Sequence, residues 1–143
     1  MGMTTELVRC YSELILLPTL EERFEYLRLN GKVGEDLFGF ERYLNQTFYH
    51  DARWYEAKDA VVLRDKGYEL GVPGWPIVGT IYVHHMNPAT KRQLIEDDPC
   101  LYDPENLISC GFNVHQAITW GSRDLLPKPM IIRRPNDTCP WKD

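Results

Sequence analysis

The feature that most constrains the fold is an apolar, β-branched run that ends in two adjacent histidines, Ile81-Tyr82-Val83-His84-His85. A run of this kind predicts a strand, which we place at residues 77–84. Asn87-Pro88 then turns the chain. Because successive side chains of a strand point to opposite sides, His84 and His85 are expected to face different surroundings where the strand ends.

A second strand and a helix are expected downstream of the histidine pair. Asn106 to Cys110 is predicted to be extended, and Phe112 to Trp120 fits a helix that Gly121 stops. His115 lies in this helix, so three of the four histidines of the chain fall in one window. Two strands followed by a helix, with three histidines among them, predict an α+β core that carries a chemical site.

The segments on either side of this core complete the predicted organisation. Helices are expected at residues 4–17, 20–30, 52–64 and 89–96, and residues 40–47 are compatible with a short helix. Thr19 and Glu22 form a capping-box pattern before the second of these helices, and Asp51 is the expected N-cap of the third. We divide the chain into a helical N-terminal arm (1–50), a core domain (51–125) and an extended tail (126–143) that contains four prolines.

Composition narrows the class of protein. A hydrophobic content of 43% fits a globular chain, and no apolar run approaches the roughly 20 residues that cross a bilayer. We find no signal-peptide pattern, so we expect a cytoplasmic protein without membrane contact. The four cysteines form no C-x-x-C pair, which favours free thiols over a zinc knuckle or disulfides. A net charge of −5 argues against a broad nucleic-acid surface, since phosphate contacts need Lys and Arg.

The residues in the histidine window are suited to metal-dependent phosphodiester hydrolysis. This reaction needs a divalent ion at the phosphate, a general base that activates water, and a group that orients the base. A histidine with a pKa near 6.5 is a competent base at neutral pH, and neutral imidazoles are common metal ligands. An asparagine side chain can orient the base through its amide.

These residues resemble the motif of the HNH endonuclease family. The matching segments are Val83–Pro88, Asn106–Ile108 and Phe112–His115, and His115 is nine positions after Asn106. Upstream, Trp54 and residues 61–68 look like the leading helix that precedes many HNH motifs. The resemblance covers about residues 51–120, and the whole chain looks like small phage or prophage HNH-like proteins. It implies a ββα-metal core between a helical arm and the tail.

The family's roles can be carried over to matching positions. The resemblance implies that His84 and His115 bind a divalent ion (Mg, Mn, Ni or Zn), that His85 is the general base, and that Asn106 orients His85. It also implies DNA as the substrate and, for a phage protein, the host cytoplasm as the location.

Three departures from the family pattern keep other functions open. The cysteine pairs that many members carry are missing, Thr119 stands where colicin-type members have a further ligand, and the chain is acidic. An alternative is a catalytically weak or inactive HNH-fold binding or assembly module, in a phage packaging or head complex or as an inhibitor of a host system. A structural zinc site alone is a third alternative.

Six basic residues are candidates for contact with nucleic-acid phosphates, although each also has a simple interpretation as solvated surface. They are Arg64, Lys91, Arg92, Arg123, Arg133 and Arg134. A phage or host protein partner is a further expectation, and the sequence does not predict the oligomeric state.

Overall fold

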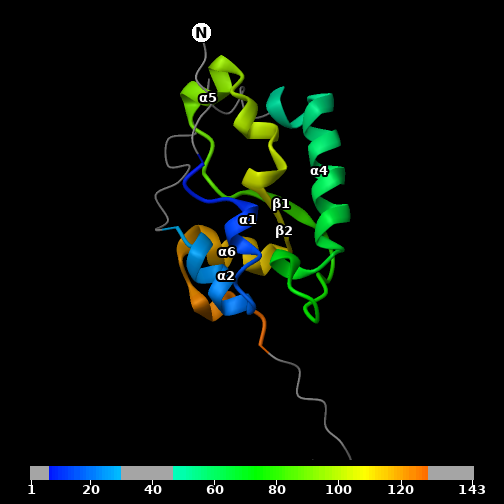
Figure 1. Cartoon of the computed structure of the whole chain (residues 1–143), viewed down its shortest axis with the longest axis vertical. Coiled ribbons are helices and arrows are strands. Elements are labelled where there is room, and N and C mark those ends of the chain that lie inside the picture. The colour runs from blue at the N-terminus through cyan, green and yellow to red at the C-terminus, as the bar shows by residue number, and fades with distance from the viewer. Residues whose placement is uncertain (1–6, 30–46, 129–143) are drawn as a thin grey trace, which may run out of the picture.

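A two-stranded antiparallel sheet lies at the centre of the fold in the computed structural model, which describes residues 7–29 and 47–128 (Figure 1). Strand β1 is Tyr82–His85 and strand β2 is Leu107–Cys110. Helix α6, Phe112–Trp120, follows β2 after a single glycine. Together with the helices around it, this small sheet gives an α+β fold, as predicted.

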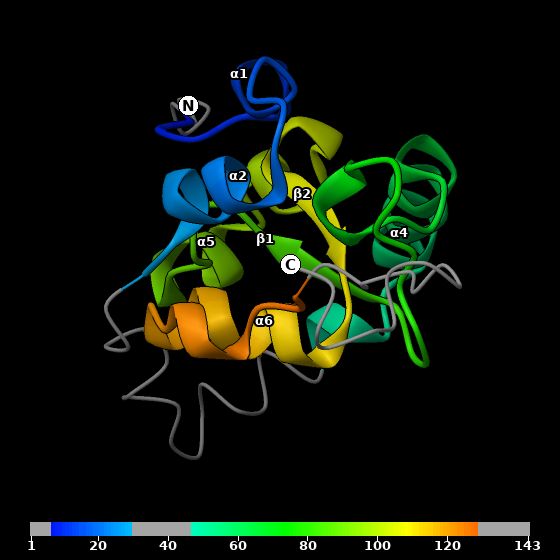
Figure 2. The ribbon, with the colours of Figure 1, turned by 90° about the horizontal axis from the view of Figure 1, so that it is seen from below.

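The other elements surround this unit. The helices are α1 (Tyr11–Leu14), α2 (Leu20–Leu27), α4 (Ala52–Asp65) and α5 (Lys91–Glu96), and the short 3-10 helices are η1 (Glu69–Gly71), η2 (Pro99–Tyr102), η3 (Pro104–Asn106) and η4 (Arg123–Leu125). Seen from below, α4 and α6 lie on either side of the two strands (Figure 2).

Three helix ends confirm the capping signals in the sequence. The side chain of Thr19 accepts a hydrogen bond from the backbone N–H of Glu22 at the start of α2, and that of Asp51 accepts one from Arg53 at the start of α4. Gly121 ends α6 with φ +66°, a left-handed conformation that costs glycine little. Local side-chain chemistry therefore decides where these helices start and stop.

Two hydrophobic clusters cover the two faces of the sheet. The larger contains Phe24 of α2, Ile118 of α6 and Ile108 of β2, whereas the smaller contains Trp54 of α4 and Leu107 of β2. Neighbouring residues of β2 thus enter different clusters, as the alternation of a strand requires. Because both faces are covered, all four residues of β2 are buried.

Three predicted boundaries were wrong. The first helix is only Tyr11–Leu14, because the backbone of Arg9 is hydrogen bonded to the side chain of Asn87 instead of to a helical neighbour. Helix α2 ends at Leu27 instead of residue 30. Two residues later, the N–H of Leu29 donates to Ile118 O in α6 and not to a carbonyl of its own helix. Strand β1 begins only at Tyr82, because the N–H of Ile77 donates to Gly67 O and a turn with φ +87° at Gly79 interrupts the predicted strand.

The predicted N-terminal arm contributes to the same core as the histidine window. Leu20, Phe24 and Leu27 are buried in one cluster with Val114 and Ile118 of α6. The short helix expected near residues 40–47 and most of the predicted tail lie outside the described residues. Within the described ranges, no helix is both long enough and apolar enough to cross a membrane.

Candidate functional site

The end of β1 presents two histidines to opposite faces of the sheet. His84 is paired with Ile108 and His85 with Leu107 across the antiparallel ladder, and directly paired residues share a face. His84 therefore faces α6, whereas His85 faces α4. Both imidazoles are buried, with about a twelfth of each residue exposed (8%).

His84 meets His115 of α6, and these are the two residues to which the family resemblance assigns the ion. The two ring centroids are 5.2 Å apart and the ring planes are nearly perpendicular, at 83°. Nε2 of His84 is buried and has no hydrogen-bond partner among the residues that the structure describes. A buried polar atom without a partner is costly, so this nitrogen needs an explanation beyond packing.

Both rings are held in the neutral form that binds metal. Burial, followed by the charges of His115, His85 and Arg9, lowers the pKa of His84 to about 3. Burial also lowers the pKa of His115. At neutral pH neither imidazole has to lose a proton before it coordinates an ion.

The geometry of this pair fits two ligands of one ion. Zn–N bonds of about 2.0–2.1 Å along the lone pairs of two imidazoles, at a tetrahedral angle, place the ring centroids about 5 Å apart. The observed separation is 5.2 Å. Nε2 of His84 has no other partner among the described residues, so it can act as a ligand when the ring proton lies on Nδ1.

A third protein ligand is not found among the described residues, which contain no group of three His, Cys, Asp or Glu side chains placed for a metal. Thr119, one turn after His115, directs its hydroxyl to the backbone oxygen of His115 at 2.9 Å. An ion on His84 and His115 would therefore complete its coordination with water or substrate oxygens.

His85 lies in an aromatic pocket on the opposite face. Its ring stacks on Trp54 with centroids 5.4 Å apart and packs beside Phe48 at 5.6 Å. Nε2 lies 3.0 Å from the backbone oxygen of Leu101. A carbonyl only accepts hydrogen bonds, so this contact assigns the proton to Nε2 and leaves the lone pair on Nδ1.

The protonation of His85 follows from the same surroundings. Burial lowers its pKa, and the hydrogen bond to Leu101 opposes that shift. The ring is therefore neutral at pH 7, with Nδ1 able to accept a proton. This is the protonation state and tautomer that a general base requires.

Asn106 organises the end of β1 without contacting the His85 ring. Its Oδ1 accepts from the backbone N–H of Asn87 at 2.9 Å and from Nδ2 of Asn87 at 2.8 Å. Its Nδ2 donates to Cys100 O at 3.0 Å, and its backbone oxygen accepts from Met86. Asn106 can thus orient His85 only indirectly, through Met86 and Asn87, which follow the histidine, and through Cys100, which precedes Leu101.

The Asn106 network extends to the N-terminal segment. Asn87 Oδ1 accepts from the backbone N–H of Arg9 at 2.9 Å, and Asn87 Nδ2 donates to Arg9 O at 2.7 Å. The sequence indicated only a turn at Asn87-Pro88. Because Arg9 and Asn87 are 78 positions apart, no local pattern could reveal this contact.

An exposed aromatic pair flanks His115. The ring of Tyr82 lies 5.9 Å from that of His115 and 6.2 Å from that of Phe112, and both aromatic residues retain substantial exposed surface. Tyr82 shares the strand face of His84, because the two are two residues apart. The candidate metal pair is therefore bordered by rings that can stack on a flat ligand.

Three of the six predicted phosphate-binding residues, Arg64, Arg92 and Arg123, already have protein partners. Arg64 stacks on the Tyr11 ring and donates to the carboxylate of Asp65 and to the backbone oxygens of Pro104 and Leu107. A phosphate at this position would have to displace those bonds.

The remaining basic candidates lie at the surface or beyond the described residues. Arg92 pairs with Glu96 within α5, and Arg123 pairs with Glu21 and Glu25. Lys91, at the start of α5, is exposed. Arg133 and Arg134 lie outside the described residues.

Comparison of the chain with models of known families, with curated proteins and with solved structures finds no match.

Proposed function

We propose that this chain is a metal-dependent endonuclease of the HNH type, which hydrolyses phosphodiester bonds in DNA at a ββα-metal site. The observation that carries the proposal is the pair of neutral imidazoles of His84 and His115, 5.2 Å apart, with an unpartnered buried Nε2 on His84. The tautomer of the neighbouring His85, which leaves Nδ1 as a proton acceptor, supports it further.

In this proposal His84 and His115 hold a divalent ion. When bound, the ion stabilises negative charge on the phosphate and on the leaving 3′ oxygen. Nδ1 of His85 takes the proton from the attacking water, and the resulting imidazolium keeps its Nε2–H bond to Leu101 O. Asn106 keeps the end of β1 in place through Asn87 and Cys100.

A plasmid-nicking assay with Mg²⁺, Mn²⁺, Ni²⁺ or Zn²⁺ tests this function. We expect nicking by the wild-type protein, and a loss of at least about a hundredfold in rate for His85→Ala, the usual contribution of a general base. His50→Ala is the matched control, because it removes an exposed histidine outside the site. Circular dichroism verifies that each variant is folded. Equal nicking by His85→Ala and wild type would refute the role of His85.

A second candidate is a binding or assembly module that keeps the HNH-like fold with little or no catalysis. The burial of His85 between Trp54 and Phe48, together with a pair rather than a trio of described ligands, favours it. For such a module, divalent ions would raise the melting temperature through His84 and His115 while no ion supports nicking. Metal-dependent nicking that requires His85 would exclude it.

A further inference from the structure

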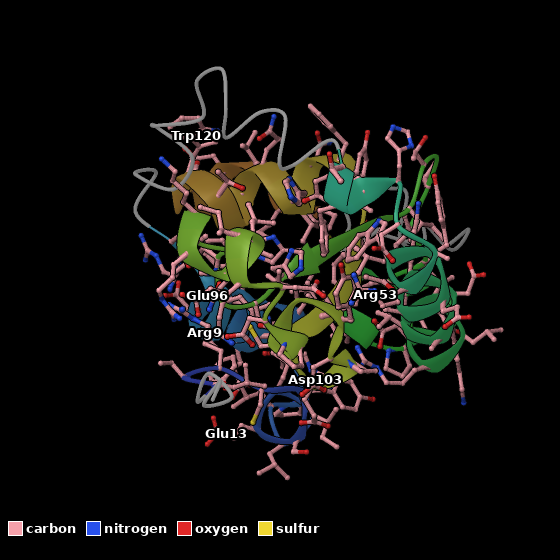
Figure 3. The ribbon with its side chains drawn as sticks, turned by 90° about the horizontal axis from the view of Figure 1, so that it is seen from above. Arg9, Glu13, Arg53, Glu96, Asp103 and Trp120 are labelled. Carbon is pink, nitrogen blue, oxygen red and sulfur yellow. The ribbon has the colours of Figure 1, made fainter. Side chains whose placement is uncertain are left out.

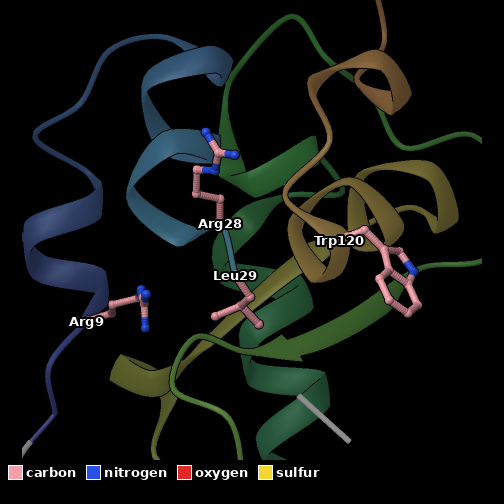
Figure 4. A pocket seen from close by; sticks show the side chains of 4 residues that line it. All are labelled: Arg9, Arg28, Leu29 and Trp120. Atoms are coloured by element: carbon pink, nitrogen blue, oxygen red, sulfur yellow. The ribbon is translucent and has the colours of Figure 1, made fainter. Parts of the chain in front are cut away.

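A cavity of about 350 Å³ lies between the N-terminal segment, the end of α2 and the end of α6. Arg9, Arg28, Leu29 and Trp120 line it (Figure 4). Its volume is at the lower end of the range for small-ligand pockets, roughly 300–1,000 Å³. None of these four residues was predicted to belong to a site.

Arg9 is held in place while its terminal nitrogens remain unpaired. Its Nε donates to Tyr26 O at 3.1 Å, and Asn87 bonds both its N–H and its carbonyl. Among the described residues, neither Nη of Arg9 has a hydrogen-bond partner, and no carboxylate pairs with it. A fixed guanidinium with two free donor groups is prepared to bind an oxyanion.

The second arginine adds to the positive charge of the cavity. Nη2 of Arg28 donates to Gly121 O at 2.9 Å, and Nη1 lies 3.3 Å from Glu25. Glu25 is the nearby carboxylate, but Arg123 binds it as well. The single carboxylate of Glu25 is thus shared by two arginines, and Arg123 also pairs with Glu21.

Trp120 supplies a ring on the far side of the cavity. It is the last residue of α6 and 61% of its surface is exposed. Exposed indoles stack on nucleobases, and such a contact is sequence-tolerant because every base has a π face. A nucleotide has a phosphate and a base. In this cavity the arginines can contact the phosphate and Trp120 can contact the base.

The residues that line the cavity are linked to the candidate metal centre through a hydrogen bond and a shared helix. Asn87, which clamps the backbone of Arg9, lies two residues after His85, and the charge of Arg9 acts on His84. Trp120 lies on the same helix as His115.

We propose that the Arg9–Arg28–Trp120 cavity is a nucleotide subsite, in which the free Nη groups of Arg9 bind the phosphate of a nucleic-acid strand, Arg28 adds its charge, and the base stacks on Trp120. The identity of the natural ligand, a strand being cut, rests on the proposed function. The binding site itself does not, because its residues are separate from the metal pair and the general base.

Binding of thymidine 3′,5′-bisphosphate in the presence of EDTA tests this subsite. The binding is measured by isothermal titration calorimetry and by the indole N–H signals in NMR spectra. We expect saturable binding that weakens with salt. Arg9→Ala should weaken it about tenfold, the loss of one charge-assisted hydrogen bond. Trp120→Ala should weaken it by a similar factor but leave the binding of inorganic phosphate unchanged.

Arg53→Ala is the matched control, because it removes an arginine that is already paired with Asp51 and Asp97 on the α4 side, away from Arg9 and Trp120 (Figure 3). It should bind the bisphosphate as the wild type does. The proposal is overturned if the bisphosphate does not bind, if Arg9→Ala binds it as tightly as wild type, or if inorganic phosphate binds equally well and Trp120 has no effect. Since no divalent ion is present, a missing nuclease activity leaves this result unaffected.

Discussion

Acidification should destabilise the fold through His84, by an amount that follows from its environment. The pKa of His84 is about 3 in the folded protein, because the ring is buried beside His115, His85 and Arg9. In the unfolded chain it returns to about 6.5, so the unfolded state takes up a proton that the folded state does not. The free energy of unfolding therefore falls as the pH drops from about 6.5 towards about 3.

At pH 5 the solution is about 1.5 units below the unfolded pKa, which gives a loss of about 2 kcal/mol from His84 alone, at about 1.4 kcal/mol per unit. Burial also lowers the pKa values of His85 and His115, so their contributions have the same sign. The total loss on acidification should exceed the part that belongs to His84.

Urea unfolding at 25 °C in EDTA, at pH 7 and pH 5, measures the part of the stability loss that belongs to His84. The wild-type protein should lose about 2 kcal/mol more between the two pH values than His84→Gln, which cannot titrate at this position. EDTA is required because a bound metal has its own pH dependence. His84→Leu is the second variant, in case glutamine prevents folding. An equal loss of stability in wild type and both variants would refute the reasoning.

Three more predictions test the metal pair, the Asn106 network and the end of α6. A divalent ion at a hundredfold excess over its Kd should raise the melting temperature of the wild type by about 5–10 °C in calorimetry, and His115→Ala should abolish this shift. Asn106→Ala should lower the free energy of unfolding in urea by about 2–4 kcal/mol, since it removes the bonds of a buried side chain to Cys100 O and to the half-buried Asn87. Asn113→Ala, at an exposed position, should change it by less than about 0.5 kcal/mol. Gly121→Ala should lower the free energy of unfolding by about 1–3 kcal/mol more than Gly67→Ala does in the same assay. Both glycines have positive φ, but only at Gly121 would the new Cβ lie 2.5 Å from a backbone oxygen.

Local signals predicted several helix ends and the second strand, but not the start of β1. Thr19, Asp51 and Gly121 each mark a helix end through a hydrogen bond or a backbone conformation that their own neighbours decide. The start of β1 depends on a partner strand 25 residues downstream, since only Tyr82 to His85 find partners in β2. The β-branched residues before Tyr82 suit a strand equally well, so the sequence alone could not show that pairing ends there.

The candidate site also has features that the sequence predicts and features that it does not. The family resemblance placed His84 and His115 at one site, and strand alternation predicted that His85 points to the other side of the strand. The contact that determines the His85 tautomer comes from a backbone carbonyl, that of Leu101, and carbonyls leave no mark in a sequence. Arg9 escaped prediction because its position depends on Asn87, 78 residues away.

The network around Asn106 changes how a mutation at this position should be interpreted. Asn106 joins Asn87 to Cys100, and Asn87 in turn holds the backbone of Arg9. Replacing Asn106 therefore loosens the end of β1, which carries His85, and the segment that presents Arg9 to the cavity. A loss of nicking in Asn106→Ala would not identify Asn106 as a residue that touches the substrate. If Asn106 acts by positioning, bisphosphate binding in EDTA should weaken together with nicking, whereas His85→Ala should abolish nicking and leave that binding unchanged.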